Sequence, residues 1–197
     1  FLLAPFVAVR TTWKRLPRKG TSLLYFSMLG LGFMFFEIGM IQRLILFLGF
    51  PTYSLSVTLA SILIFTAVGA LLSPRLLARC DGKVERAAGP LAGAVVGLGA
   101  IYLLAVPELT DAMLGTALWL RVATTFVLLA PLGVCLGMFM PLGLGAVSAL
   151  TDHGAEYVAW SWAVNGFASV VGSVLTTLIA MSFGFDVVIV AAVWAYL

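Results

Sequence analysis

The sequence predicts an all-α fold: a polytopic transmembrane helix bundle with about five complete spans and a partial span at each end. Of the 197 residues, 62% are hydrophobic and only 10% are charged, and the mean hydropathy is +1.15. A soluble domain typically carries about 25% charged residues. The apolar runs are also continuous rather than alternating with polar residues, which favours membrane helices over a β-barrel.

We expect one transmembrane helical domain over 1–197, with short loops between its spans. The predicted spans are 1–9 (partial), 23–49, 53–72, 90–106, 118–148, 158–182 and 187–197 (partial). The two end segments are apolar but too short to cross a bilayer, so we expect the chain to be a fragment of a longer protein. Segment 1–9 lacks a basic n-region and a cleavage site, and is therefore not a signal peptide.

The distribution of basic residues predicts the orientation of these spans. Loops 10–22 and 73–89 fall on the same side of the membrane and hold nine of the eleven Lys and Arg residues. The positive-inside rule places both loops in the cytoplasm, and we expect the cell inner (plasma) membrane. The connections on the other side hold acids and no basic residue. Contact with anionic lipid explains the net charge of +3 better than nucleic-acid binding does.

Glu37 is the strongest functional candidate, because it lies in the middle of span 23–49. A charge at this depth costs about 2.5–3.5 kcal/mol on insertion scales, so we expect it to face a cavity, another helix or a partner chain. A protonated carboxyl with only a structural hydrogen bond is the alternative. Arg43 lies on a different face of the helix and can snorkel to the outer interface. Gln42 and Asn165 complete the candidate intramembrane polar site; for Asn165 we weigh an interhelical hydrogen bond against a substrate contact.

The remaining polar and small residues in the spans predict packing. Hydroxyls of span 53–72 can bond back to their own helix and need no functional role. Pro131 and Pro141 predict a kinked or broken helix in 118–148. Small residues four positions apart predict close helix contacts. These pairs are Gly93 and Gly97, Gly133 and Gly137, Ala168 and Gly172, and Ser169 and Ser173.

Catalytic chemistry is not predicted for this chain. The only histidine, His153, lies in a predicted loop, and the sequence has no P-loop, no Gly-rich dinucleotide motif and no catalytic triad pattern. Cys80 and Cys135 form neither a Cys-x-x-Cys pair nor a plausible disulfide. We therefore expect no cofactor, no metal and no catalytic residue in this chain.

Two stretches resemble the multi-pass membrane module of bacterial spermidine synthase-like proteins. These are Tyr25 to Arg75, and Leu132 to Gly172. The matching landmarks are Glu37, Arg43-Leu44, Tyr53-Ser54, the run Gly69 to Arg75, Met140-Pro141-Leu142, and Trp162 to Asn165. In that family a helical module of major-facilitator-like character is fused to an S-adenosylmethionine-type Rossmann domain. The resemblance implies a membrane module whose soluble catalytic domain is absent from this sequence.

Three functions stay open at this point. The first is a non-catalytic membrane module that anchors, and that handles a small cationic or amphiphilic substrate near Glu37. The second is an accessory subunit of a larger membrane complex, in which Glu37 pairs with a neighbouring chain. The third is part of a major-facilitator-like transporter. In each, we expect the lipid bilayer and other transmembrane helices, or a partner chain, as contacts.

Overall fold

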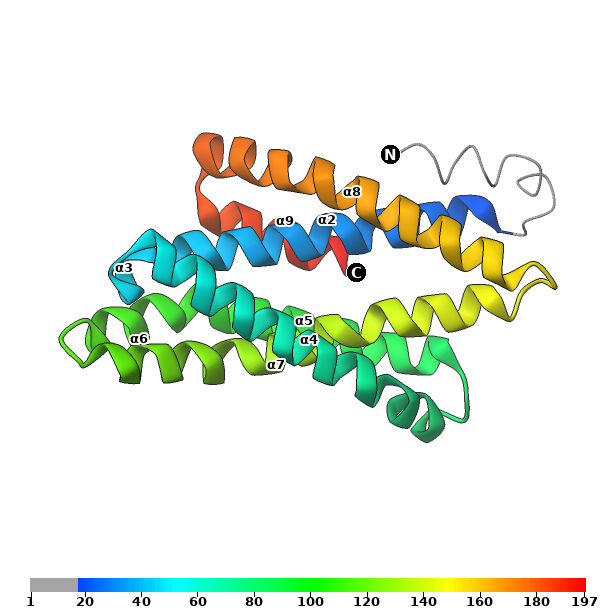
Figure 1. The fold of residues 1–197 in the computed structure, drawn as a ribbon, viewed down its shortest axis with the longest axis horizontal. Helices are drawn as coiled ribbons and strands as arrows, with labels where there is room; N and C mark the ends of the chain where they lie inside the picture. Colours follow the sequence, from blue (N-terminus) through cyan, green and yellow to red (C-terminus); the bar gives the residue numbers. More distant parts are fainter. Residues whose placement is uncertain (1–17) are drawn as a thin grey trace.

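The computed structural model describes residues 18–197, and these residues form helices without strands (Figure 1). Predicted span 1–9 and most of loop 10–22 lie outside the described residues. The helices are α2 (Lys19–Arg43), α3 (Ile45–Leu48), α4 (Pro51–Arg79), α5 (Val84–Leu104), α6 (Val106–Met113), α7 (Leu118–Ser148), α8 (Gly154–Phe183) and α9 (Phe185–Ala195).

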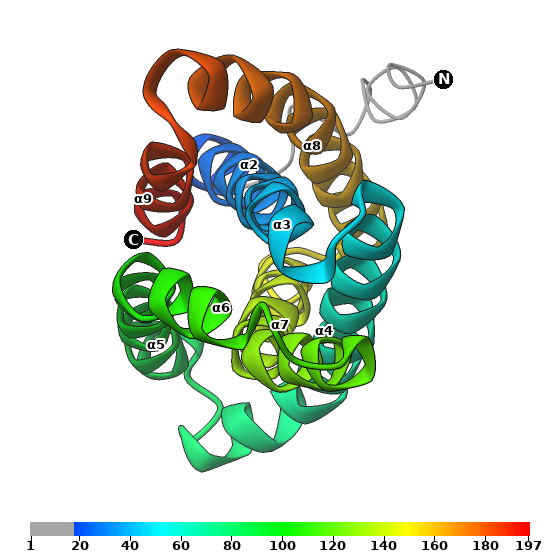
Figure 2. The ribbon, with the colours of Figure 1, turned by 90° about the vertical axis from the view of Figure 1, so that its left-hand side faces the viewer.

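The predicted fold class is confirmed: the protein is a multi-pass bundle of membrane helices. Five helices, α2, α4, α5, α7 and α8, are long and apolar enough to cross a bilayer. They have 21 to 31 residues, and about 20 residues cross the hydrocarbon. Helix α9 has only 11 residues and ends partway along the bundle (Figure 1), and it lies next to α2 and α5 (Figure 2).

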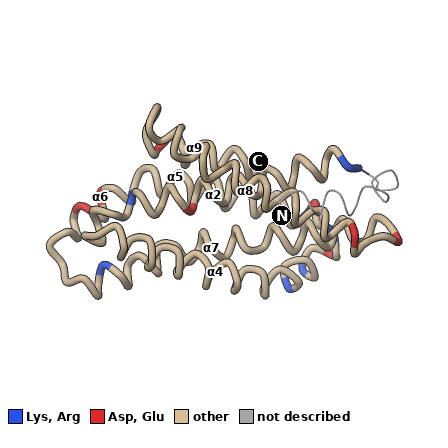
Figure 3. The backbone as a smooth tube through the Cα atoms, turned by 45° about the horizontal axis from the view of Figure 1, so that its top comes forward, with Lys and Arg blue, Asp and Glu red and all other residues tan. Residues whose placement is uncertain are grey.

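Charged residues gather towards the two ends of the bundle (Figure 3). We call one of them the basic end, and the opposite one the far end. Among the described residues, the basic end carries Arg18, Lys19, Arg75, Arg79, Lys83 and Arg86, and the far end carries Arg43 and Arg121. This separation agrees with the orientation predicted from the loops.

Several helices extend beyond the predicted apolar spans. Helix α4 continues to Arg79, where the sequence suggested a loop from 73, and 107–117 contains the short helix α6. Apolar residues mark the hydrocarbon layer, whereas backbone hydrogen bonding continues a helix into the interface. Basic residues such as Arg75 and Arg79 can reach the headgroups from the end of a helix.

Helix α7 is continuous through both internal prolines, so of the predicted kinked or broken helix the broken alternative does not occur. Each proline removes a backbone N–H from the helix ladder. Two tyrosines donate to carbonyls just before these prolines. Tyr102 bonds the Leu128 oxygen and Tyr25 bonds the Phe139 oxygen, both at 2.7 Å. Both hydroxyls come from neighbouring helices and reach α7 within three residues of a proline.

Glycines bring α4 and α7 into backbone contact. A Cβ on Gly137 would collide with the backbone oxygen of Thr66, and a Cβ on Gly69 would collide with that of Val134. Because lipid tails are as apolar as the side chains, such close packing, rather than hydrophobicity, holds membrane helices together. The predicted contact at Gly133 and Gly137 is confirmed.

A second glycine crossing joins α2 to α8. A Cβ on Gly172 would lie 3.2 Å from the Cα of Leu31, and Gly30 lies against the backbone oxygen of Asn165. The small pair Ala168 and Gly172 therefore packs as predicted. Gly93 and Gly97 do not, because no atom of the described residues lies within 4 Å of a Cβ placed on either.

The two crossings are the same structure repeated 103 positions apart, which the sequence analysis did not detect. Helices α4 and α8 begin at Pro51 and Gly154, which are also 103 positions apart. The equivalent contact residues are Gly30 and Gly133, Asn165 and Ile62, Ala168 and Phe65, and Gly172 and Gly69. Buried hydroxyls follow the same spacing at Ser22 and Thr125, Thr58 and Ser161, and Ser73 and Thr176.

The bundle therefore consists of two three-helix repeats of opposite orientation. The first repeat is α2, α4 and α5, and the second is α7, α8 and α9. A half-turn in the plane of Figure 1 carries α2 towards α7, α4 towards α8 and α5 towards α9. Helix α2 starts at the basic end, whereas α7 starts at the far end. Such inverted repeats, related by an axis in the membrane plane, are typical of secondary transporters.

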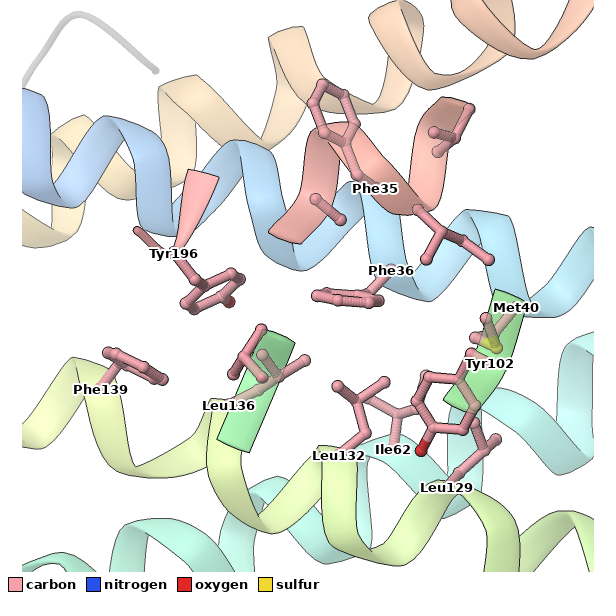
Figure 4. Packing of buried hydrophobic residues seen from close by; sticks show 14 of the residues in the cluster. Phe35, Phe36, Met40, Ile62, Tyr102, Leu129, Leu132, Leu136, Phe139 and Tyr196 are labelled. Atoms are coloured by element: carbon pink, nitrogen blue, oxygen red, sulfur yellow. The ribbon is translucent and has the colours of Figure 1, made fainter. Parts of the chain in front are cut away.

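The core forms where both repeats meet. Figure 4 shows Phe36 and Met40 of α2 facing Leu132 of α7, with Tyr196 close to Phe139. Phe36, Met40 and Leu132 are fully buried, and the Phe139 and Tyr196 rings lie 4.9 Å apart. This packing holds α2 and α7 at the centre, while α4 and α8 lie outside them.

Alanine should destabilise the protein at a glycine of the crossing, and should have little effect at a glycine outside it. Gly137→Ala should lower the free energy of unfolding by about 1–3 kcal/mol, because its methyl group would collide with the α4 backbone. Gly93→Ala should change it by no more than about 0.5 kcal/mol. Detergent-induced unfolding of the purified variants measures both, and equal effects would contradict the assigned crossing.

Candidate functional site

A cavity of about 530 Å³ lies in the basic half of the bundle. Helices α2, α4, α7 and α8 line it, together with Tyr196 after α9. Its α7 residues, Leu136 to Leu144, come from the second half of that helix, and its α8 residues come from the first half. Leu63 and Trp162 are exposed at its rim, one on α4 and one on α8.

Besides the rings of Trp162 and Tyr196, which carry an N–H and a hydroxyl, three polar side chains interrupt the apolar wall of this cavity: Thr66, Asn165 and Ser169. Asn165 Nδ2 donates to the Phe26 oxygen at 3.2 Å, and this confirms an interhelical hydrogen bond. Ser169 Oγ donates to the Asn165 backbone oxygen at 3.0 Å. No residue of 18–197 donates to Asn165 Oδ1, so this oxygen remains an acceptor in the cavity wall.

Although it lies in the basic half, the cavity reaches the axis that relates the two repeats at two pairs of equivalent residues. Phe33 and Leu136 are equivalent positions, 103 apart, and both line it. Thr66 and Ser169 are likewise equivalent, and both line it. In transporters with inverted repeats, ligand sites lie near the middle of the membrane where the repeats meet. Position, rather than polarity, makes this cavity the candidate site.

Glu37 lies beside the cavity without lining it. It continues the α2 ridge of Leu29 and Phe33, which do line the cavity, and is one helical turn further towards the far end. The side chain is only 8% exposed. Within residues 18–197, Glu37 has no hydrogen-bond or ion-pair partner.

Two hydroxyls at the same level are also without partners. Thr58 and Ser61 of α4 are fully buried, and neither Oγ atom bonds any described residue. Ser54, one turn before Thr58, donates to the Ile41 oxygen at 2.5 Å. Because α2 and α4 are antiparallel, this contact places Thr58 level with Glu37. We call Glu37, Thr58 and Ser61 the far-half polar group.

The far-half polar group corrects the expectation that the α4 hydroxyls bond back to their own helix. Thr66 does so, with Oγ1 3.0 Å from the Leu63 oxygen. Thr58 and Ser61 do not. A buried polar group without a partner typically costs about 1–3 kcal/mol. The unpaired state of these two hydroxyls could not be read from the sequence, since Ser and Thr at such positions usually bond locally.

Arg43 forms an ion pair at the far end of the bundle. This agrees with the expectation that its side chain extends towards that interface. Its Nη2 lies 2.8 Å from Oδ1 of Asp186 in the first turn of α9. The Arg43 side chain is 16% exposed and that of Asp186 is 70% exposed. This pair ties α2 to α9, while Arg43 Nη1 is buried without a partner among the described residues. A similar cation, Arg121, donates to the Phe47 oxygen at 2.9 Å.

The four candidate residues named from the sequence do not form one site. Asn165 lines the cavity, Glu37 belongs to the far-half polar group, Arg43 pairs with Asp186, and Gln42 is exposed. Sequence reasoning missed Thr66 and Ser169 as site residues. The sequence repeat could have identified them, because Thr66 and Ser169 lie at the same distance from the starts of α4 and α8, which are 103 positions apart.

The cavity wall is suited to binding rather than to bond making. Apolar side chains form most of it, with the amide of Asn165 and the hydroxyls of Thr66 and Ser169 among them. Within residues 18–197, no three His, Cys, Asp or Glu side chains come together as metal ligands would. Such a wall can hold an apolar chain and accept or donate a few hydrogen bonds.

Comparison with known proteins gives no relative for this chain. No family model, no curated protein and no solved structure matches it.

The unpaired hydroxyl of Thr58 predicts an unusual stability effect. Thr58→Val replaces it with a methyl group of similar size, and should leave the free energy of unfolding unchanged or raise it by up to about 1 kcal/mol. Thr176→Val is the matched control. Thr176 is equally buried, but its Oγ1 donates to the Gly172 oxygen at 2.7 Å. The control should be the less stable variant in detergent unfolding, and the reverse order would show that Thr58 is bonded.

Proposed function

We propose that this chain is a non-catalytic integral-membrane module that binds a small amphiphilic molecule in the cavity between its two repeats. The observation that carries the proposal is that this cavity extends from the repeat axis into the basic half, with Thr66, Asn165 and Ser169 in a largely apolar wall. Because its spans are apolar, the chain would also anchor an attached domain or partner chain in the bilayer.

The composition of the cavity wall favours an amphiphile with an uncharged polar group. No Asp or Glu of residues 18–197 lines this cavity, so nothing in its wall offsets the cost of burying a cation. An amide oxygen and hydroxyls suit a hydroxyl or carbonyl group on the ligand. Leu63 and Trp162 at the rim offer entry for an apolar chain from the lipid side.

The family resemblance adds a proposal of its own. Membrane modules of spermidine synthase-like proteins accompany a nucleotide-binding domain, and the present module would present its ligand to such a domain. The landmarks from Glu37 to Arg75 and from Leu132 to Gly172 are the support for this association. Transport is a second candidate function, which the inverted repeat specifically favours.

Filling the cavity should abolish binding. Ala67 of α4 lines the cavity, whereas its neighbour Val68 does not and is 38% exposed. We expect Ala67→Trp to reduce labelling by a photoreactive long-chain alcohol at least about tenfold, equivalent to about 1.4 kcal/mol of binding. Val68→Trp, which adds the same ring next to the cavity, should label like the unmodified protein. Labelling is measured in nanodiscs, with the modified peptides identified by mass spectrometry.

The outcome separates cavity binding from general lipid contact. Labels concentrated on the cavity-lining segments of α4, α7 and α8, and lost in Ala67→Trp, support the proposal. Equal labelling of both tryptophan variants, or labels spread evenly over the lipid-facing helices, would contradict it.

A further inference from the structure

Two hydroxyls of the cavity wall lie at the middle of the membrane. Thr66 is the sixteenth of the 29 residues of α4, and Ser169 is the sixteenth of the 30 residues of α8. Both helices are long enough to cross a bilayer, so their middle residues lie near the depth of its centre. The cavity therefore offers these polar groups within the hydrocarbon, away from the layer that holds lipid head groups.

The polar group of a ligand at this depth is uncharged. A charged group at the centre of a bilayer is costly unless an opposite charge or water lies beside it. The cavity-lining residues, within the part of the chain that the structure describes, include no Asp, Glu, Lys or Arg. This excludes a phospholipid head group from the position beside Thr66 and Ser169.

The hydroxyl protons of Thr66 and Ser169 are already used within the protein. Thr66 Oγ1 donates to the Leu63 oxygen at 3.0 Å, and Ser169 Oγ donates to the Asn165 backbone oxygen at 3.0 Å. A hydroxyl has one proton and two lone pairs. Each of these oxygens can therefore still accept a hydrogen bond, but has no proton left to donate to a ligand.

The side-chain amide of Asn165 adds a third acceptor, and α2 fixes its orientation. Asn165 Nδ2 donates to the Phe26 oxygen at 3.2 Å. A backbone oxygen only accepts, so the amide nitrogen must face Phe26 and Oδ1 must face away from it. Gly30, one turn after Phe26, lies against the backbone oxygen of Asn165 and holds α8 close enough for this bond.

Donors available to a ligand are fewer than acceptors. Trp162 carries an indole N–H, but this side chain lies at the rim and is 55% exposed. The Tyr196 hydroxyl is enclosed by protein, so it does not reach the cavity. The second N–H of the Asn165 amide is free. Three acceptor oxygens at mid-membrane therefore stand against one amide N–H among the described residues of the wall.

We propose that the cavity selects an apolar alcohol, whose hydroxyl donates to Asn165 Oδ1, over the ketone or ether of the same skeleton. The alcohol brings a donor to an acceptor that the protein leaves unused, whereas a ketone or an ether brings only a further acceptor. This inference rests on the proposed function. It adds the class of the ligand and names Asn165 as the residue that determines specificity.

The test is a competition in nanodiscs against the photoreactive long-chain alcohol. The three competitors have one apolar skeleton and differ only at the polar group, which is a hydroxyl, a ketone or a methyl ether. Only labelling that Ala67→Trp abolishes is counted, so general lipid contact cancels. The alcohol should compete at least about fivefold better than the ketone or the ether, which is the worth of one hydrogen bond between neutral groups.

Variants of α8 assign the preference to the cavity wall. Asn165→Leu should bring the alcohol and the ketone to equal labelling when each is used as a photoreactive probe, and retained ketone labelling reports that the variant is folded. Ser169→Ala removes a second acceptor and should lower the preference. Ser173→Ala is its matched control and should keep the full preference. Ser173 lies one turn further along α8, donates to the Val170 oxygen at 2.8 Å and does not line the cavity.

Failure of this inference and failure of the proposed function give different results. Equal competition by the alcohol and the ketone in the unmodified protein would overturn the selection of an alcohol, and would leave the cavity as a binding site. A preference that survives Asn165→Leu, or that falls equally in Ser169→Ala and Ser173→Ala, would overturn the role of the polar wall. Absence of cavity labelling by both photoreactive probes would overturn the proposed function itself.

Discussion

Backbone contact at two glycine crossings is the constraint on which the rest of this structure depends. Gly69 and Gly137 join α4 to α7, and Gly30 and Gly172 join α2 to α8. In a bilayer the hydrophobic effect does not press helices together, so the closeness of these contacts must supply the attraction. The two crossings are equivalent under a two-fold rotation, so their positions define the axis that relates the two repeats.

The cavity follows from this geometry. One crossing holds α4 against α7, and the other holds α8 against α2. Helices α4 and α8 are therefore separated from each other where the axis passes between them. Phe33 and Leu136 form matching parts of the cavity wall, and Thr66 and Ser169 form another matching pair. A site on such an axis is shared by both repeats, so a movement of either repeat changes its shape.

Buried polarity is distributed unequally between the two repeats. The second repeat places Asn165 in the open cavity and satisfies its Ser161 hydroxyl. The first repeat buries Glu37, and the hydroxyls of its Thr58 and Ser61 have no partner among the described residues. A carboxylate kept in hydrocarbon without a partner is costly, and the cost is recovered only when a cation arrives or the group is protonated. The repeats therefore share a fold but differ in the chemistry they offer to a ligand.

The sequence by itself determined the fold class, the five long spans, the separation of basic residues and the intramembrane positions of Glu37 and Asn165, because hydropathy and charge act locally along the chain. It also indicated that Arg43 and Glu37 cannot pair on one helix face, since helical periodicity alone decides this. Only the tertiary structure decided that Gly133 and Gly137 pack while Gly93 and Gly97 do not, that Arg43 pairs with Asp186, and that Thr58 lacks a partner. These outcomes depend on which helix faces meet, and a span of apolar residues carries little information about its neighbours when lipid and protein are equally apolar. The spacing of Gly30 and Gly133 already contained the repeat, but the two halves differ too much in sequence for it to be recognised. It became visible when the structure placed the two glycines in equivalent helix contacts.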